Sequence, residues 1–181
     1  QKHIIAVNDG AQRSVYNHLV AVGNERFRLR QAAKYVPAYR NHLQYLQDTA
    51  SSTAGMKTAL PYLNEADVDS DTVNNAFRNY RFAWKNMKES HRGVPTFHKK
   101  SAAQSYQTNS HYKSGDTGIF DGSIRFDGMS HLILPKIGRI RIGASPKLLQ
   151  ELLVHPTARR ITTVTVQRDA VGEYWCSIAI A

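Results

Sequence analysis

An apolar stripe between residues 73 and 87 constrains the fold more than any other feature of the sequence. The stripe consists of Val73, Ala76, Phe77, Tyr80, Ala83, Trp84 and Met87. Its members follow the i, i+3, i+4, i+7 spacing of one helix face over about four turns. A helix with such a face has to pack against another element, so this segment predicts an amphipathic helix in a folded domain.

The acidic run directly before this helix, residues 65–71, has a structural interpretation. Aspartate and serine cap helix N-termini, and carboxylates near the first turn interact favourably with the helix dipole. No histidine lies within the run. We therefore expect a helix entrance here and no metal site.

The rest of the N-terminal half predicts one strand and two further helices. Residues 2–7 are short and β-branched, which favours a strand, and Asp9-Gly10 then resembles a turn. Apolar residues from Val15 to Val22 recur at helical spacing, and a second helical stretch covers about 39–46. Residues 51–55 are expected to form a loop.

After Pro95 the helical rhythm disappears, and the chain predicts mainly strands. Short strands are expected at 118–120, 123–126, 131–134 and 139–142, and long ones at 160–168 and 174–180. Residues 169–173 suit a hairpin loop between the last two strands. One helix is expected at 145–153, with Ser145 as its cap and Pro146 in its first turn.

The order of these elements predicts an α+β fold, namely a discontinuous, OB-like β-barrel with an inserted helical domain. Residues 1–8 would form the first barrel strand, residues 9–91 the helical insertion, and residues 92–181 the remainder of the barrel. Strands before and after the helices are what an insertion into a barrel requires.

The charge of the chain favours a polyanionic partner, although many basic proteins are merely soluble. Lys and Arg number 24 against 14 Asp and Glu, which gives a formal net charge of +10. Cys176 is the only cysteine, so neither a disulfide within the chain nor a Cys-pair zinc site can form. Its alternation with Tyr174 and Ile178 predicts a core position. No apolar run reaches the roughly 20 residues of a membrane span, so we expect no membrane partner and a cytoplasmic, nucleoid-associated protein.

A second stripe runs beside the apolar one on the predicted helix at 73–87. It consists of Asn74, Arg78, Arg81, Lys85 and Lys88, offset by one residue, or about 100° of rotation. Its cations would lie on an exposed shoulder about 21 Å long, which suits a row of phosphates. The alternative is an ordinary solvated helix face.

The segment after this helix mixes basic, aromatic and hydroxyl side chains. We expect Arg92, Lys99 and Lys100 to contact phosphates, as Arg78, Arg81, Lys85 and Lys88 would on the helix. Candidates for base or sugar contacts are Asn74, Asn75, Thr96, Gln104, Ser105 and Tyr106. The alternative is that Pro95 and Phe97 only anchor the loop to the barrel, which we expect for Phe97.

Catalysis has little support in the sequence. The eight histidines show no paired metal spacing, and there is neither a Gly-rich phosphate loop nor a nucleophile elbow. Asp116, Asp121 and Asp127 lie near glycines, as turn residues do. We therefore expect no catalytic residues, no bound metal and no cofactor in this chain, and a small standalone enzyme is the weakest alternative.

Several segments, taken in order, also match the pattern of a known family. They are Arg13-Ser-Val-Tyr-Asn-His18, residues 73–86, Gly93-Val-Pro-Thr-Phe-His-Lys-Lys100, Gln104-Ser-Tyr106, residues 133–142 and the predicted terminal hairpin. Together they resemble the OrfB/TnpB family of transposon-encoded RNA-guided nucleases and the related compact type V CRISPR effectors. The third segment, for example, is similar to the family's Gly-x-Pro-x-Phe-Lys-Lys-Lys.

The resemblance implies a wedge-type β-barrel with an inserted recognition domain. In that family these domains hold guide RNA and read a short motif beside the double-stranded DNA target. The family's RNase H-like catalytic domain, with its divalent metal, follows the terminal hairpin, where this sequence stops. We therefore expect a non-catalytic portion of an RNA-guided DNA endonuclease. The alternative is a naturally nuclease-less DNA-binding regulator or transposition accessory protein.

Two positions depart from the family pattern. Asn74 and Asn75 stand where the family has a Gln-Gln pair, and the shorter side chains alter which base they can reach. His98 replaces a lysine, which weakens one phosphate contact at neutral pH.

Overall fold

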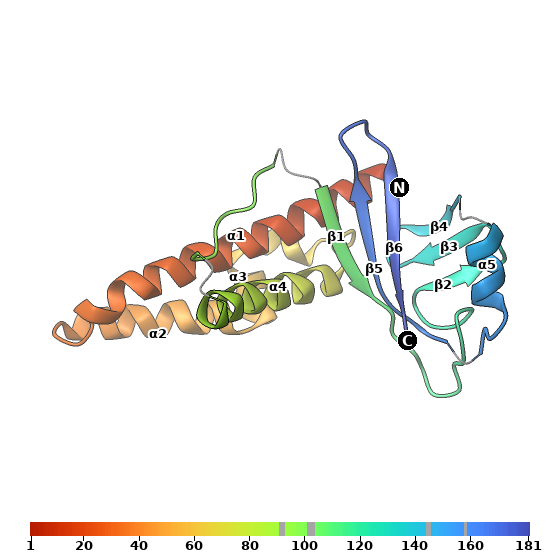
Figure 1. The fold of residues 1–181 in the computed structure, drawn as a ribbon. Coiled ribbons are helices and arrows are strands. Elements are labelled where there is room, and N and C mark those ends of the chain that lie inside the picture. The colour runs from red at the N-terminus through yellow and green to blue at the C-terminus, as the bar shows by residue number, and fades with distance from the viewer. Residues whose placement is uncertain (91–92, 101–103, 144–145, 158) are drawn as a thin grey trace. The chain divides into compact units, whose positions relative to one another are not determined.

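A computed structural model describes residues 1–90, 93–100, 104–143, 146–157 and 159–181 (Figure 1). The fold is mixed α+β, as predicted, with helices first and small antiparallel sheets after them. The elements are α1 (Lys2–Ala32), α2 (Pro37–Ser51), α3 (Thr53–Ala59), the 3₁₀ helix η1 (Pro61–Asn64), α4 (Ser70–Glu89), β1 (Gln104–Asn109), β2 (Arg125–Asp127), β3 (His131–Leu134), β4 (Gly138–Arg141), α5 (Pro146–Leu153), β5 (Ile161–Arg168) and β6 (Tyr174–Ile180).

The chain folds into two compact units. The first comprises Gln1–Asp9 and Ala103–Ala181 and is called the sheet unit below; the second, Gly10–Ala102, is called the helical unit. The sheet unit is therefore built from two separate stretches of chain, with the helical unit between them in sequence. Among the described residues, no helix combines the length and apolar character needed to cross a membrane.

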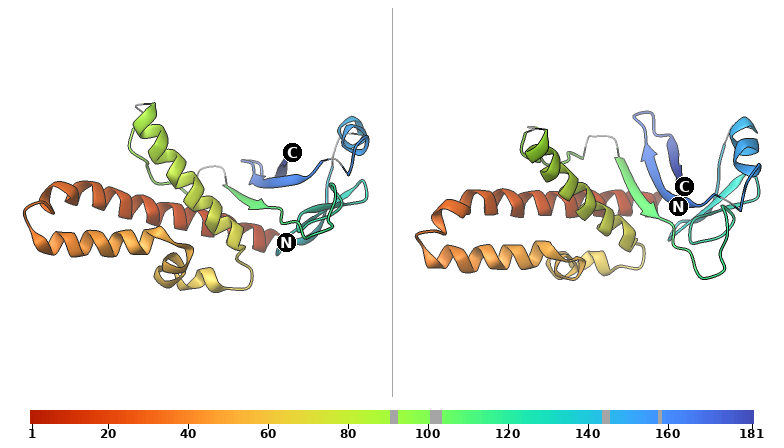
Figure 2. Two further views of the ribbon diagram at one scale, coloured as in Figure 1. Left: turned by 90° about the horizontal axis from the view of Figure 1, so that it is seen from below. Right: turned by 60° about the horizontal axis from the view of Figure 1, so that its bottom comes forward.

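In the helical unit, α2 runs back along α1, as Figures 1 and 2 show from three directions. The most deeply buried large side chains include Val15, Leu19, Val20, Met56, Leu63 and Val73. The predicted stripe of α4 faces this core over its first half, where Val73, Ala76 and Phe77 are buried. From Tyr80 onward the stripe is only half-buried.

Helix α1 approaches α4 closely at Gly23. A Cβ at this position would overlap the Tyr80 hydroxyl and lie 3.1 Å from Cζ2 of Trp84. Only glycine leaves room for these two rings, so Gly23 sets the spacing of α1 and α4 at this point.

The predicted capping of α4 is confirmed. Asp69 is its N-cap, and the Asp69 carboxylate accepts a 3.1 Å hydrogen bond from the backbone N–H of Asp71. Asp71 lies in the first turn, where its charge complements the helix dipole.

The sheet unit contains two three-stranded antiparallel sheets with strand orders β1-β5-β6 and β2-β3-β4. Neither sheet closes into a barrel. The two sheets share one core, to which α5 and the start of α1 also contribute. This core contains Tyr106, Ile119, Ile124, Phe126, Leu132, Leu134, Ile137, Leu152, Ile161, Val164 and Val166, with Ile4 and Ile5 against it.

The terminal hairpin is confirmed, with β5 and β6 paired on either side of residues 169–173. Asp169 shapes the loop by accepting hydrogen bonds from the backbone N–H groups of Val171 and Glu173, at 3.0 and 2.8 Å. Cys176 packs against the core together with Tyr174 and Ile178, as predicted. Burial raises the pKa of the half-buried Cys176 thiol, which disfavours the reactive thiolate form.

The predicted first strand at residues 1–8 is wrong, because α1 begins at Lys2. Helical spacing continues upstream from Val15 through Ala11 to Asn8 and Ile4, and the buried positions follow it. The Asn8 side chain donates to the Ile4 carbonyl one turn earlier, at 2.9 Å. Packing of this helical face outweighs the strand preference of the β-branched residues.

Two other local predictions also fail, and one strand was not predicted. Residues 51–55 do not form the expected loop, because only Ser52 separates the end of α2 at Ser51 from the start of α3 at Thr53. Strand β1 was not expected, because its polar sequence lacks an apolar run. Residues 118–120 form a turn in place of a strand, and Gly118, at φ +86°, sits where a Cβ would overlap the Pro156 carbonyl. The predicted cap residue Ser145 lies outside the described residues.

Candidate nucleic-acid interface

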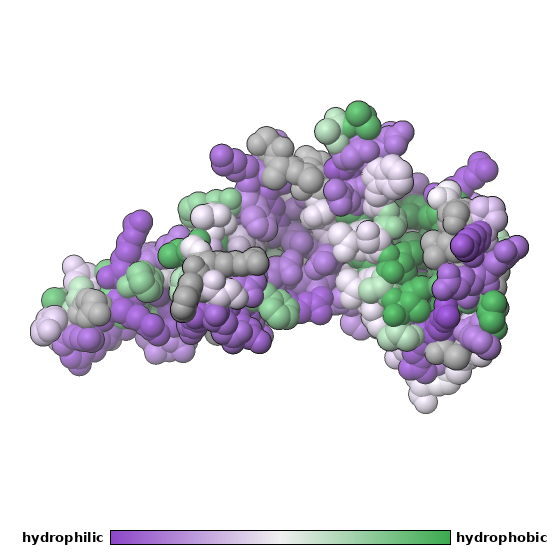
Figure 3. Space-filling model, in the orientation of Figure 1, coloured by the Kyte–Doolittle hydropathy of each residue, from purple (hydrophilic) through white to green (hydrophobic). Residues whose placement is uncertain are grey.

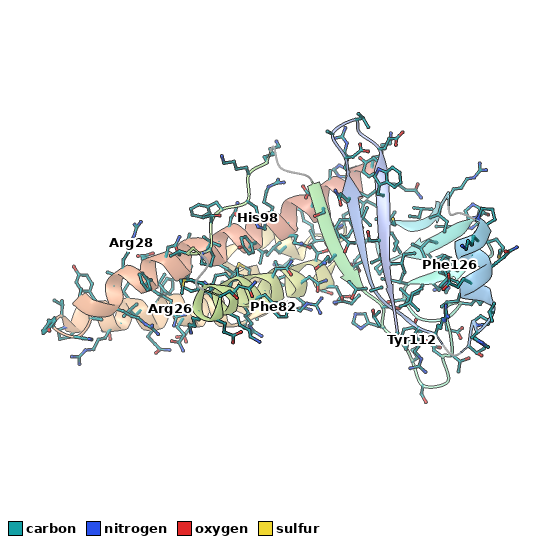
Figure 4. All side chains as sticks on the ribbon, in the orientation of Figure 1. Arg26, Arg28, Phe82, His98, Tyr112 and Phe126 are labelled. Carbon is teal, nitrogen blue, oxygen red and sulfur yellow. The ribbon has the colours of Figure 1, made fainter. Side chains whose placement is uncertain are left out.

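The cationic stripe lies on the exposed side of α4. Asn74, Arg78, Arg81, Lys85 and Lys88 are all exposed. Capping at Asp69 starts the helix, and burial of the apolar stripe turns this shoulder outward. Phe82, which belongs to neither stripe and directly follows Arg81 on α4 (Figure 4), is 53% exposed.

Asn75 does not share the exposure of its neighbour Asn74. It is 1% exposed, and its side-chain oxygen accepts a hydrogen bond from Arg78. The Asn75 amide therefore serves the helix and is not presented to a base. Of the pair that matches the family's Gln-Gln, only Asn74 reaches solvent.

A groove of about 600 Å³ runs between α1 and the C-terminal half of α4, where the apolar stripe is only half-buried. It is called the basic groove below and is lined by Arg26, Phe27, Arg30, Tyr80, Arg81, Trp84, Lys85, Met87, Lys88 and Glu89. Five of these ten residues are Lys or Arg, and one is acidic. Every lining residue belongs to the helical unit.

The sequence predicts the α4 side of this groove but not the α1 side. Arg26, Arg28 and Arg30 alternate over five positions of α1 around the aromatic residue Phe27. That density of arginine was an available signal. That α4 lies across the groove from these arginines depends on the packing of α1 and α4 at Gly23. The spacing of residues along the chain does not reveal this packing.

The groove keeps most of its positive charge. Lys85 and Glu89 form an i, i+4 pair at 3.8 Å, but both side chains are more than half exposed. Such a pair contributes only about 0.3–0.5 kcal/mol. Arg26 donates to the Gln47 side-chain oxygen at 3.1 Å, a neutral partner that orients the guanidinium without cancelling its charge.

Aromatic rings form the uncharged part of the groove. The Trp84 ring lies 6.3 Å from Tyr80 in an edge-on arrangement and 6.5 Å from Phe27 at a tilt of 39°. Burial raises the pKa of Tyr80, with the Arg26 charge acting in the opposite direction, so the phenol is neutral at physiological pH. The groove therefore offers cations and flat apolar rings together.

Two neighbouring side chains of α1, Asn17 and Tyr16, contact the loop after α4 at His98. Asn17 donates to the His98 carbonyl at 3.0 Å and accepts from the His98 backbone N–H at 2.7 Å. The Tyr16 and His98 rings stack with their centroids 4.0 Å apart. Burial, and then the charge of Arg13, lower the pKa of His98. A neutral His98 adds no charge, whereas the adjoining Lys99 and Lys100 are exposed.

A second hollow, of about 370 Å³, separates α1 from this loop and is called the loop hollow below. Asn24, Phe27, Arg28, Val94, Pro95, Thr96 and Phe97 line it. Pro95 is buried and holds the loop, but Phe97 is 55% exposed, so the expectation that Phe97 is an anchor is wrong. Thr96 is exposed at the hollow.

The remaining predicted contacts lie elsewhere. Tyr106 is 1% exposed in the core of the sheet unit, so its ring is not presented to a base. Ser105 is half-buried in β1. Arg92 and the side chain of Gln104 lie outside the described residues.

The sheet unit has a hollow of its own, of about 510 Å³, called the sheet hollow below. It is lined by His111, Tyr112, Lys113, Asp116, Phe120, Asp121, Gly122, Ser123 and Arg125. Asp116 accepts from the backbone of Lys113 and Asp121 from that of Thr117, each at 2.8 Å, which confirms their turn role. Asp127 pairs with Arg139, and the hydrogen bond and charge of Arg139 lower the pKa of the Asp127 carboxyl.

No group of three His, Cys, Asp or Glu residues that could hold a metal ion occurs in the part of the chain that the structure describes. In comparisons with known proteins, no family model matches the chain and no curated protein matches it significantly.

Proposed function

We propose that the helical unit binds nucleic acid through the basic groove and the adjoining cationic shoulder of α4. One observation carries the proposal: five cations from two helices line a single groove with one acid, and neutral aromatic rings lie among them. Five cations that line one groove repel one another, and a polyanion that neutralises them removes this repulsion. Lysine and arginine side chains bind phosphates by this neutralisation, which releases counterions.

The finer part of the proposal concerns the parent protein. We infer that this chain is the recognition portion of a TnpB-type RNA-guided DNA endonuclease, with guide RNA and target DNA as partners and a cytoplasmic, nucleoid-associated location. The segments between Arg13 and the terminal hairpin that resemble that family support this inference, as does the position of the helical unit between two stretches of the sheet unit. The two sheets would then be parts of a wedge-type barrel.

The test measures affinity for fluorescein-labelled duplex DNA and for a structured RNA at several salt concentrations. We expect binding at low salt that weakens steeply as salt rises, by about −0.9 in the logarithmic slope for each phosphate neutralised on a duplex. Arg81→Ala combined with Lys85→Ala removes two groove cations. This variant should bind at least about tenfold more weakly, and its slope should fall by about 1 to 2.

The matched control is Lys34→Ala combined with Lys147→Ala. It removes two exposed lysines that lie outside the groove, and it should leave the affinity and the salt slope near the wild-type values. The proposal fails if the wild-type chain binds neither probe at low salt, or if the two double variants behave alike.

A further inference from the structure

Phe27 occupies a special position in the helical unit, because it lines both the basic groove and the loop hollow. Arg26 lines the groove, and Arg28 lines the loop hollow. Two residues of an α-helix turn through about 200°, so these arginines project to opposite sides of α1, as Figure 4 shows. The ring of Phe27 therefore lies between two cations.

The ring is also open to solvent. Phe27 is 58% exposed, and Trp84 meets it at a tilt, so Trp84 does not stack face to face on it. Phe97, which lines the loop hollow with Phe27 and Arg28, is 55% exposed, and Phe82, which follows Arg81 on α4, is 53% exposed. On the face that Figure 3 shows, the surface over the helical unit is mostly hydrophilic. Two exposed rings, Phe27 and Phe97, therefore meet a cation, Arg28, at one hollow, and neighbouring exposed apolar groups of this kind are typical of a binding surface.

The chemistry of the two hollows limits what can cover Phe27. Cations on both sides require an anionic ligand, and the ring requires a flat apolar group. Unpaired nucleotides provide both, because each joins a phosphate to a base with an open π-face. A duplex keeps its base faces stacked inside the helix and would leave the phenylalanine ring uncovered.

We propose that Phe27 is the stacking platform of a site for unpaired nucleotides. A single strand of nucleic acid would cross α1 there, from the basic groove to the loop hollow. The proposal rests on the function proposed above and adds a preference for single strands. Arg26 and Arg28 neutralise phosphates on either side of the stacked base. Thr96 and Asn24, which line the loop hollow, offer hydrogen bonds to the edge of the stacked base.

The test compares three labelled probes of equal length, about 20 nucleotides, longer than the 4–16 typical of one single-strand-binding module. They are oligo(dT), the same backbone with abasic sites throughout, and a DNA duplex. The abasic strand keeps the phosphates and lacks the bases. We expect Phe27→Ala to weaken oligo(dT) binding by about 5- to 100-fold, the usual effect of removing one stacking ring. Binding of the abasic strand and the duplex should change less than about twofold, with unchanged salt slopes.

Two controls accompany the variant. Phe27→Trp keeps a flat ring and should retain oligo(dT) binding, whereas Tyr35→Ala removes an aromatic ring that is 84% exposed and lines neither hollow, and should have no effect. Thermal unfolding should show that Phe27→Ala folds normally, since its ring is mostly outside the core.

Four outcomes would overturn the proposal, and they differ in what they leave standing. If all three probes bind the wild type but Phe27→Ala changes the affinity for none of them, Phe27 is not a stacking site, and the proposal that the groove binds nucleic acid is unaffected. If the variant weakens all three probes equally, Phe27 only shapes the groove. If Phe27→Ala instead abolishes self-association of the chain and leaves oligo(dT) binding intact, the ring belongs to a protein interface. If no probe binds the wild type at low salt, the proposed function fails as well.

Discussion

The basic groove of the helical unit and the sheet hollow are similar in size, about 600 and 510 Å³, but the groove is strongly positive and the charges of the sheet hollow balance. The groove has five Lys or Arg residues and one acid, whereas the sheet hollow has two Lys or Arg residues and two aspartates. The aspartates of the sheet hollow are also engaged with backbone N–H groups of their own loop. The size of a hollow therefore says little about its ligand, and unbalanced charge identifies the groove.

The largest expected effect comes from reversing charge in both places. Arg81→Glu with Lys85→Glu should weaken duplex DNA binding by about 100-fold, because two attractive contacts become repulsive. Lys113→Glu with Arg125→Glu makes the same change of charge in the sheet hollow and should change affinity by less than about threefold. Fluorescence anisotropy at one fixed salt concentration measures both. Equal losses would remove the distinction between the two hollows.

The second prediction changes the shape of the groove and leaves its charge alone. Gly23→Ala pushes a methyl group into Tyr80 and Trp84, so the free energy of unfolding should fall by about 1–3 kcal/mol. Gly10→Ala is the matched control in the same helix, since nothing lies within 4 Å of its Cβ position. That variant should gain up to about 1 kcal/mol from helix propensity. Urea titrations measure the free energy of unfolding of both variants. A Gly23→Ala variant more stable than the wild type would contradict the close approach of α1 and α4.

A third prediction separates structural acids from the cations that bind ligand. Asp69→Ala removes the N-cap of α4 and should lower the free energy of unfolding by about 1 kcal/mol. Glu65→Ala, an exposed acid four residues earlier, should stay within about 0.5 kcal/mol of the wild type. Chemical denaturation of the two variants provides the comparison. If Asp69→Ala costs no more than Glu65→Ala, the cap does not stabilise the helix that carries the cationic shoulder.

The smallest expected effect concerns pH. The pKa of His98 is lowered below its ordinary value of 6.5 in the docked loop, so the undocked loop takes up a proton more readily. Docking is therefore fully favoured above about pH 6.5 and weakens as pH falls through the lowered pKa of His98. Hydrogen exchange at the His98 amide, which donates to Asn17, should quicken relative to its intrinsic rate on acidification. Asn17→Ala should lose this protection at every pH. An NMR titration midpoint at or above 6.5 would contradict the assignment.

The sequence predicted those parts of the groove that depend on spacing within one helix. Apolar and cationic stripes one residue apart fix which side of α4 faces water, and they placed Arg81, Lys85 and Lys88 correctly on the exposed side. Arg26 and Phe27 were missed because they meet α4 only through packing across more than 50 residues of sequence, and Gly23 gives no sign of this on its own.

Burial was the other property that the sequence did not reveal. Asn75 and Tyr106 were chosen as contacts from their chemistry and from the resemblance, and both side chains are 1% exposed. At the N-terminus, β-branched residues suggested a strand, although Ile4 and Ile5 pack against the core from a helix. Local preference was a weaker guide there than the helical spacing that continues through Ala11.

The central claim, that the basic groove is where nucleic acid binds, is tested most directly by locating the bound ligand. Hydrogen exchange with and without a single-stranded oligonucleotide, read by mass spectrometry, compares peptides from the whole chain. Binding in the basic groove should give new protection in peptides covering residues 24–30 and 78–89, and unchanged exchange around the sheet hollow at residues 111–125. Protection confined to residues 111–125, with α1 and α4 unaffected, would contradict it.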